Sequence, residues 1–152
     1  MAVLPIVTEG HPVLRRKARP VTKITKRIQK LIKDMAETMY DAKGAGLAAP
    51  QVNVSERLIV VDVGQGLVAL IDPELIKAEG AVRDVEACLS IPGKSGYVTR
   101  AAQIVVKGLD PRGKQIKVEG NGYFARAIQH EIDHLEGILF IDRMEEERGA
   151  SR

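Results

Sequence analysis

The segment Gln129–Gly137, QHEIDHLEG, contains two of the three histidines of the chain, four residues apart. On a helix of about 3.6 residues per turn, His130 and His134 project from one face, so their imidazoles can converge on a single metal ion. Glu131 follows about 100° further around the helix, beside such an ion and not on it. The segment therefore predicts a helix with two metal ligands and a carboxylate suited to act as a general base.

The pattern His-Glu-x-x-His is typical of zinc-type metallohydrolases, whose catalytic sites use three protein ligands and leave one position open for water. Two unrelated histidines on an amphipathic helix are the alternative interpretation. The third ligand must come from outside the motif. A metzincin would carry a histidine where this chain has Phe140. A thermolysin-like enzyme takes a glutamate from a later helix, whereas the glutamates that follow here lie in a hydrophilic tail.

Cys88 is the only cysteine of the chain and the strongest remaining candidate, although a free cysteine is most often a small buried hydrophobe. One cysteine and two histidines would leave a coordination position open, as catalysis requires. The thiolate favours Fe²⁺ or Zn²⁺ over Mg²⁺ or Ca²⁺. A single cysteine also fits a reducing compartment. Nearby, Glu86 is expected either to pair with Arg100 or to lie on the surface.

A second unusual stretch, Gly44–Gln51 (GAGLAAPQ), is rich in glycine and alanine. It lacks the Gly-Lys-Ser/Thr ending of a phosphate loop. Its glycines would let the backbone approach a ligand closely, and Gln51 offers an uncharged amide donor. By itself the stretch is a weak signal, and a loop that ends a helix is the alternative interpretation.

The composition predicts one globular domain over residues 1–152, with 45% hydrophobic and 28% charged residues. The apolar runs are too short to span a membrane, and the amino terminus lacks a secretory pattern, so a cytoplasmic location is expected. The net charge is +3, and the basic stretches 15–17 and 23–33 have no interleaved aromatic residues. We therefore expect no specific nucleic-acid partner, while weak attraction to a large polyanion such as the ribosome is compatible with the charge.

Two helices are expected, separated by a β-rich middle, and this order favours an α+β fold over a doubly wound one. The first helix should begin after the N-cap Thr25 and stop at Gly44, with one apolar face buried. The second should open at Asn121 and run to about Leu135, with Gly137 as its stop.

The segments outside these helices are predicted from turn residues and alternating apolar runs. LIVVDV at 58–63 and LVALI at 67–71 should be strands joined by a Gly-Gln-Gly turn. AQIVVKGL, which ends at Leu109, and KQIKVEG flank an Asp-Pro-Arg-Gly turn, which predicts a hairpin. Residues 1–24 should form an extended arm, and residues 145–152 a frayed tail.

Together and in this order, GAGLAAPQ, EACLS and QHEIDH closely resemble the three motifs of the peptide deformylase family. That family carries a glycine-hydrophobic-glycine-hydrophobic-Ala-Ala-x-Gln segment, then Glu-Gly-Cys-Leu-Ser, then Gln-His-Glu-x-x-His. The likeness extends to LPIVTEGHPVLR near the start and GILFIDRM near the end, so it covers nearly the whole chain. Each motif alone is suggestive, and the three together are highly specific.

The resemblance implies a metal-dependent hydrolase that removes the N-formyl group from the formylmethionine of newly made polypeptides and releases formate. It implies mixed or antiparallel sheets packed around the central metal-binding helix, with an N-terminal helix. One Fe²⁺ per chain is the implied metal, with Zn²⁺, Ni²⁺ or Co²⁺ able to replace it. The implied metal ligands are Cys88, His130 and His134, the implied catalytic groups are Glu131, Gln51 and the backbone N–H of Leu89, and the implied peptide contacts are Gly44, Ala45 and Gly46.

Three departures from the family pattern accompany this resemblance. Ala87 replaces the glycine before the cysteine, which would cost roughly 1 kcal/mol if the position needs a positive φ and is harmless otherwise. Ala45 is small where the family has a branched residue, so a roomier groove is expected. The chain ends soon after FIDRM, so the resemblance does not extend to any ribosome contact made through a longer C-terminal helix. The rival hypotheses are a His-Glu-x-x-His metallopeptidase and an inactive deformylase-like binding module.

Overall fold

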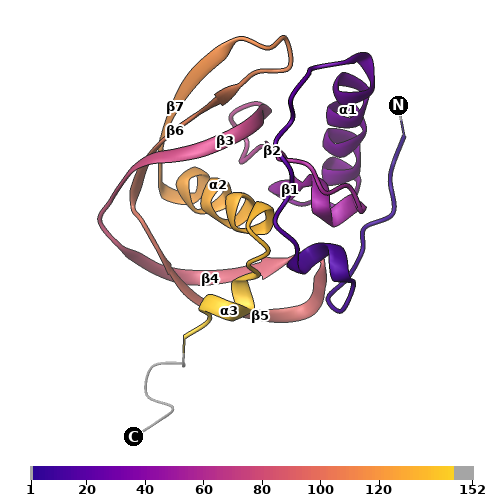
Figure 1. Ribbon diagram of the computed structural model, residues 1–152. Helices are drawn as coiled ribbons and strands as arrows, with labels where there is room; N and C mark the ends of the chain where they lie inside the picture. Colours follow the sequence, from indigo (N-terminus) through magenta and orange to yellow (C-terminus); the bar gives the residue numbers. More distant parts are fainter. Residues whose placement is uncertain (1, 146–152) are drawn as a thin grey trace, which may run out of the picture.

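The computed structural model describes residues 2–145, which form an α+β unit in which two sheets surround helix α2 (Figure 1). The larger sheet has the strand order β1-β2-β3-β6-β7, and β4 and β5 form a separate two-stranded sheet. Every pairing within these sheets is antiparallel. The predicted α+β class is therefore confirmed. The elements are η1 (Pro12–Arg15), α1 (Lys26–Asp41), β1 (Gly46–Ala48), η2 (Ala49–Val52), β2 (Leu58–Val61), β3 (Val68–Glu79), β4 (Val82–Cys88), β5 (Ile91–Arg100), β6 (Gln103–Leu109), β7 (Gln115–Asn121), α2 (Gly122–Leu135) and α3 (Phe140–Arg143).

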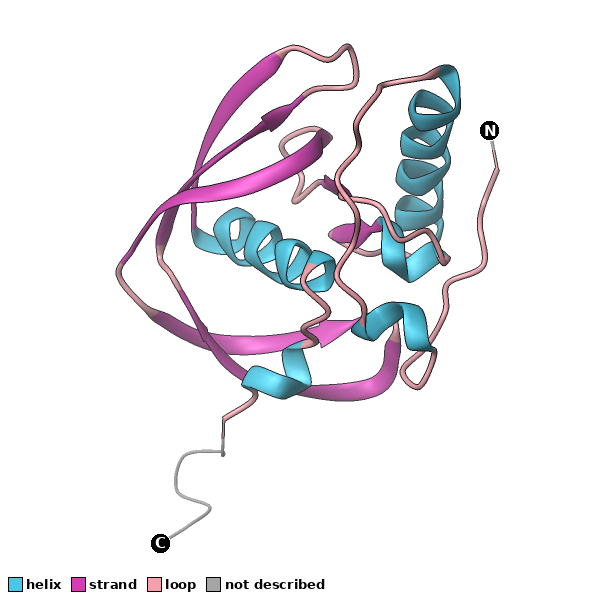
Figure 2. Cartoon of the chain, viewed as in Figure 1, coloured by secondary structure: helices cyan, strands magenta, loops and turns pink. Residues whose placement is uncertain are grey.

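Strand β2 separates the two halves of the hydrophobic core. Its side chains alternate between the two faces of the sheet, as extended backbone requires. Ile59 and Val61 belong to the cluster that packs on α2, and Leu58 and Val60 belong to the cluster that packs on α1. All four are at most 1% exposed, so each contributes roughly 1.5–3 kcal/mol of burial. This packing places α2 inside the curved sheets and α1 outside them, as Figure 2 shows.

Helix α1 begins as the sequence predicts. The Thr25 hydroxyl accepts a hydrogen bond from the Ile28 N–H and so caps the first turn. The predicted apolar face is buried, with Met35 and Met39 fully inaccessible to solvent. The methionines are thus core residues, which confirms their interpretation as packing groups.

The end of α1 differs from the prediction that Gly44 is the stop. The helix ends at Asp41, and Lys43 adopts the left-handed conformation with φ of 58°. The Lys43 N–H bonds to the Tyr40 carbonyl at 3.0 Å, and the Gly44 N–H bonds to the Met39 carbonyl at 2.9 Å. This is a Schellman motif in which Lys43 holds the position that usually favours glycine. Gly44 stands one residue later, where its lack of a side chain lets Leu89 pack closely, as described below.

Helix α2 has the predicted limits. It follows the N-cap Asn121, ends at Leu135, and is stopped by Gly137 with φ of 77°. A Cβ atom on Gly137 would lie 2.7 Å from the Arg15 carbonyl oxygen, so both its φ and its close contact require glycine. The helix therefore has a fixed length, and its last turn packs against the N-terminal arm.

Both predicted strand pairs are present, in register across β2–β3 and β6–β7. Strand β3, however, continues to Glu79, well beyond the predicted 67–71. The hairpin of β4 and β5 was not predicted as strands at all, although it carries Cys88. Most of its side chains are exposed, and buried and exposed residues do not alternate regularly. The sequence therefore shows no apolar alternation that would indicate strands there.

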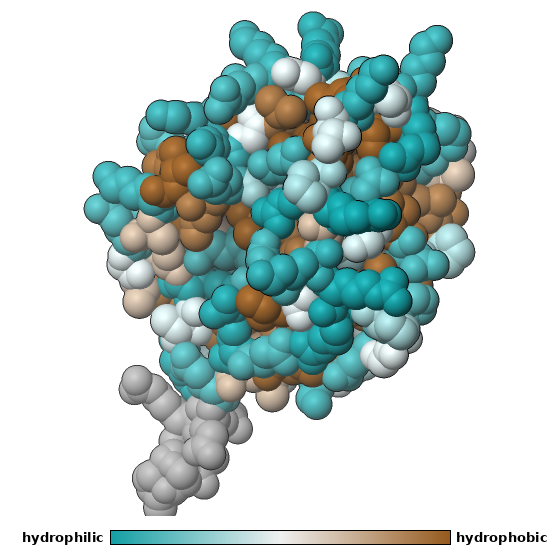
Figure 3. Space-filling model, viewed as in Figure 1, coloured by the Kyte–Doolittle hydropathy of each residue, from teal (hydrophilic) through white to brown (hydrophobic). Residues whose placement is uncertain are grey.

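The two chain ends contain little regular structure in the described residues. Residues 2–24 lack helices and strands except for η1 and a bridge between Arg19 and Glu56. The tail was expected to fray from residue 145, but the Glu145 N–H donates to the Tyr97 carbonyl at 2.8 Å. Residues 146–152 lie outside the described part. Within residues 2–145, no helix has the length and apolar character to cross a membrane, and Figure 3 shows a face covered largely by hydrophilic side chains.

We predict that Lys43→Gly raises the free energy of unfolding by roughly 0.5–1 kcal/mol. Glycine removes the roughly 1–2 kcal/mol of strain that a side chain causes in the left-handed conformation. Part of this gain is lost because glycine makes the unfolded chain more flexible, which stabilises the unfolded state. Urea denaturation of both proteins measures the difference. Lys33→Gly, inside the exposed face of α1, is the matched control and should lower stability by about 1 kcal/mol. Equal losses in both variants would contradict the strain at Lys43.

Candidate metal centre

Cys88, His130 and His134 lie together where β4 ends beside α2. Their possible ligand atoms are all within 4.8 Å of one another, and the Cys88 Sγ atom is 3.3 Å from His134 Nε2. His130 and His134 are 8% and 1% exposed, respectively. One thiol and two imidazoles in this geometry are able to hold one borderline or soft divalent cation and leave a position open.

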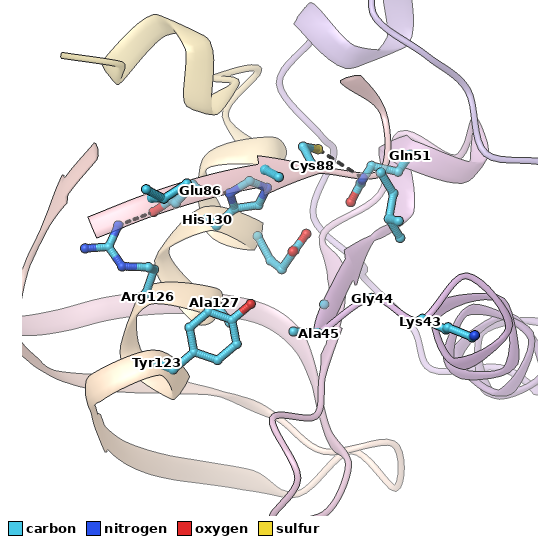
Figure 4. A pocket seen from close by; sticks show the side chains of 15 residues that line it. Lys43, Gly44, Ala45, Gln51, Glu86, Cys88, Tyr123, Arg126, Ala127 and His130 are labelled. Atoms are coloured by element: carbon cyan, nitrogen blue, oxygen red, sulfur yellow. Dashed lines mark hydrogen bonds and ion pairs between the residues drawn. The ribbon is translucent and has the colours of Figure 1, made fainter. Parts of the chain in front are cut away.

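A buried carboxylate orients the first of these histidines. Glu86 Oε1 lies 2.9 Å from His130 Nδ1, which leaves Nε2 as the ring atom able to bind a cation. Arg100 forms two hydrogen bonds to Glu86, of 2.7 and 2.8 Å, and Arg126 forms one of 2.6 Å. The predicted pairing with Arg100 is therefore confirmed, and the alternative of a surface glutamate is wrong. Figure 4 shows Glu86 between His130 and Arg126.

The electrostatics of these groups follow from burial and direct partners. Burial raises the pKa of Glu86, but hydrogen bonds with Arg100 and His130 outweigh it and hold the pKa well below its ordinary value. Burial lowers the pKa of His130, whereas hydrogen bonds to Cys88 and Glu86 raise it to about 10. For His134, burial lowers the pKa well below 6.5. Because a histidine binds a metal as neutral imidazole, a cation held by His130 would displace a proton from that ring.

Glu131 lies between α2 and β1. It is 4% exposed, and its Oε1 atom has no hydrogen-bond partner among residues 2–145. Burial is the main cause that raises its pKa to about 7. A Cβ atom on Gly46 would lie 2.6 Å from Glu131 Oε2, so the side chain occupies space that only glycine leaves open. The backbone of β1 therefore fixes the position of this carboxylate.

The side-chain amide of Gln51 has a defined orientation. Its Oε1 atom accepts the Ala48 N–H at 2.9 Å, while Nε2 donates to Ser90 Oγ at 3.1 Å and approaches Cys88 Sγ at 3.6 Å. The donor end thus faces the cysteine. Gly44 completes this side, because a Cβ atom there would meet Leu89 Cδ1 at 2.8 Å. The missing side chain at position 44 thus lets the end of Leu89 pack closely against this loop.

A cavity of about 380 Å³ opens onto these groups. The loop before β1 forms one wall, and β4 and α2 form the other (Figure 4). Tyr123, which is 61% exposed, projects from α2 toward Ala45. His134, which is 1% exposed, is not among the residues that line the cavity. The predicted residues that line it are Gly44, Ala45, Gly46, Gln51, Cys88, Leu89, His130 and Glu131.

The sequence reasoning missed the groups that support the site. Arg126, Ser90 and Asp133 are 5%, 0% and 8% exposed, respectively. Arg126 precedes His130 by one helical turn, so its place on the same face of α2 was the available signal. Ala87 lies in β4 without a positive φ, so the glycine usual in the family is not needed there. The expected roominess beside Ala45 stays a prediction.

An antiparallel α+β fold with a helical His-Glu-x-x-His segment and a thiol donor beside a cavity defines a metal-dependent hydrolase. The family model for polypeptide deformylase matches residues 3–149. The chain belongs to the polypeptide deformylase family, as its three motifs predicted.

Individual relatives agree along almost the whole chain. The peptide deformylase of Halothermothrix orenii is 58% identical over 146 residues, covering 95% of each protein. That of Pelotomaculum thermopropionicum is 57% identical over 143 residues, covering 94% of this chain and 92% of the relative. The crystal structure of peptide deformylase from Thermotoga maritima matches with a TM-score of 0.93 and 45% identity, covering 95% of this chain and 99% of that one.

We predict that Glu86→Gln lowers the free energy of unfolding by about 3–5 kcal/mol at neutral pH, because buried Arg126 loses its counter-charge and buried Arg100 keeps only that of Asp133. Since the folded pKa of Glu86 is lowered, its stabilisation is complete above the ordinary glutamate pKa of 4.5 and is lost as the pH falls toward the folded pKa. The two stability curves should therefore converge in acid. Urea denaturation across pH measures this. Glu79→Gln, in an exposed pair, is the control, and a difference independent of pH would contradict the role of charge.

Proposed function

We propose that this protein removes the N-formyl group from the formylmethionine of newly made polypeptides and releases formate. The observation that carries the proposal is a cavity lined by Cys88, His130, Glu131 and Gln51, with His134 completing the donor set beside it, in a chain of the deformylase family. The hydrolase class follows from the family. The assignment of a role to each residue is our inference from its place in the cavity.

We infer that Cys88, His130 and His134 hold one Fe²⁺ per chain, with Zn²⁺, Ni²⁺ or Co²⁺ as substitutes. The thiolate favours these ions over hard cations such as Mg²⁺. The donor set fits such an ion because its ligand atoms already converge and the His130 Nδ1 is engaged by Glu86. When bound, the ion would supply Lewis acidity, which lowers the pKa of a water molecule toward neutrality.

Glu131 is the group placed to move protons in this reaction. Its carboxylate lies beside the donor set and is shielded from bulk water, so it can take the proton of the attacking water. After attack on the formyl carbon, the same carboxyl group returns the proton to the leaving amine nitrogen. A pKa of about 7 suits both transfers near neutral pH, since the group then accepts and donates with little driving force either way.

Gln51 and the Leu89 N–H are proposed to stabilise the negative charge that develops on the formyl oxygen. The Gln51 amide is already oriented by Ala48 and Ser90, so little reorganisation is needed when charge appears. Loss of one such donor typically costs ~10²- to 10³-fold in rate. The exposed backbone of Gly44, Ala45 and Gly46 is proposed to bind the peptide as an added strand, because β1 is the edge of its sheet.

The rival functions account for fewer observations. A metallopeptidase with a merely buried cysteine leaves the convergence of Cys88 with both histidines unexplained. An inactive binding module leaves unexplained why Glu131 is kept buried beside that group, against its desolvation cost.

We predict that the protein purified without oxygen and supplied with Fe²⁺ or Ni²⁺ releases formate from formyl-Met-Ala-Ser and leaves the peptide bonds intact. Formate assay and mass spectrometry of the peptide distinguish deformylation from internal cleavage. Cys88→Ser should lose metal affinity and rate together, because an alcohol is a poorer ligand than a thiolate. No formate with any of the four metals would disprove the proposed function, and wild-type affinity in Cys88→Ser would disprove the third ligand.

We propose that the protein works in the cytoplasm, where its nascent substrates are made, and that its net charge of +3 gives a weak, non-specific attraction to ribosomes. Such an attraction should appear as co-sedimentation with ribosomes at low salt and disappear as ionic strength approaches physiological values. Co-sedimentation that resists salt would instead indicate a specific contact, and none at low salt would contradict the proposal.

A further inference from the structure

Helix α3 is tied to α2 by an arginine at the surface. Arg143 donates from Nε to Asp133 Oδ2 at 2.6 Å and from a terminal nitrogen to Oδ1 at 3.0 Å. The Arg143 side chain is 46% exposed, whereas that of Asp133 is 12% exposed. The pair therefore joins a solvent-accessible cation to a nearly buried carboxylate with a two-point geometry that fixes its orientation.

From Asp133 the contacts continue without a gap to the metal centre. Asp133 Oδ2 also accepts from Arg100 at 2.6 Å, and Arg100, whose side chain is 4% exposed, holds both oxygens of Glu86. Glu86 then contacts His130 Nδ1. We call these five side chains the relay: Arg143, Asp133, Arg100, Glu86 and His130.

Loss of Arg143, the exposed end of the relay, should affect the other members because Arg100 pairs with two carboxylates at once, Asp133 and Glu86. With Arg143 present, Asp133 is neutralised from outside, and the guanidinium of Arg100 can remain bidentate on Glu86. Without Arg143, Arg100 would be the remaining cation paired with the negative charge of Asp133. In a buried environment that attraction is strong, and it would draw Arg100 away from Glu86 and loosen the hydrogen bond that orients His130.

We propose that Arg143 is a positioning residue for the metal centre, which holds the ring of His130 in its ligating orientation through Asp133, Arg100 and Glu86. The proposal rests on the proposed function only in taking His130 as a metal ligand. A direct partner of a ligating histidine typically affects metal affinity ~10- to 100-fold, and Arg143 acts from further out, so we expect roughly 3- to 10-fold.

A matched control is available on the same helix. Arg15 forms an ion pair with Asp142, and the exposed fractions of their side chains, 48% and 37%, resemble that of Arg143. This pair also anchors α3, and the hydrogen bonds of Arg15 go to Asp142 and the Gly137 carbonyl and not to Asp133, Arg100 or Glu86. Arg15→Met therefore loosens α3 and removes one surface charge, as Arg143→Met does, while it leaves Asp133 neutralised. Arg143→Lys keeps the charge and loses the two-point geometry.

The test uses the four full-length proteins loaded with Co²⁺ or Ni²⁺. We expect Arg143→Met to lose metal to a chelator roughly 3- to 10-fold faster than wild type and to shift the Co²⁺ visible spectrum. Arg143→Lys should be intermediate. Arg15→Met should match wild type in its rate of metal loss and in its Co²⁺ spectrum, even if its melting temperature falls as much as that of Arg143→Met. The proposal would be overturned if Arg143→Met and Arg15→Met lost metal at equal rates, or if neither lost metal faster than wild type.

Imidazole ¹⁵N NMR of the metal-free proteins separates this proposal from the proposed function. The His130 signals should move in Arg143→Met and not in Arg15→Met, because only the former disturbs Glu86. If wild type binds no metal but the His130 signals respond in this way, the relay holds and the metal assignment fails. If the His130 signals are the same in all four proteins, Arg143 has only a structural role.

Discussion

The buried charge of Glu86 is the constraint on which the rest of this structure depends. A carboxylate 6% exposed is costly unless it is fully hydrogen-bonded. Arg100 from β5, Arg126 from α2 and His130 from α2 supply those bonds. The same interactions hold the β4–β5 hairpin against the central helix. Because Cys88 is the last residue of β4, satisfying this one charge also brings the cysteine to the two histidines.

The opposite wall of the site depends on the absence of side chains. Gly44 leaves room for Leu89, and Gly46 leaves room for Glu131. Strand β1 therefore lies against α2 closely enough to bury the proposed general base, while its outer edge has no partner strand among residues 2–145. The same strand thus packs against Glu131 and offers the backbone edge proposed to bind the peptide, which connects packing to the proposed chemistry.

The sequence was most informative where local rules decide structure. Both helix starts, the stop at Gly137 and two of the strand pairs were predicted from capping residues, turn residues and apolar periodicity. The prediction at Gly44 was wrong because two constraints compete there. The left-handed conformation falls on Lys43, and glycine is used one residue later for contact with Leu89. A pattern of residue types does not show which of the two constraints a glycine satisfies.

The sequence by itself determined the family, through its three motifs, and the α+β class, through the order of its elements. It also predicted that Cys88, His130 and His134 act together, and the structure brings their possible ligand atoms within 4.8 Å of one another. Only the tertiary structure decided which groups support that site. Arg100 and Asp133 are 33 residues apart yet share a hydrogen bond of 2.6 Å, and β4 has no apolar period that would reveal its fold. Such contacts form because buried charges must find partners wherever the fold brings them, and no local rule encodes that pairing.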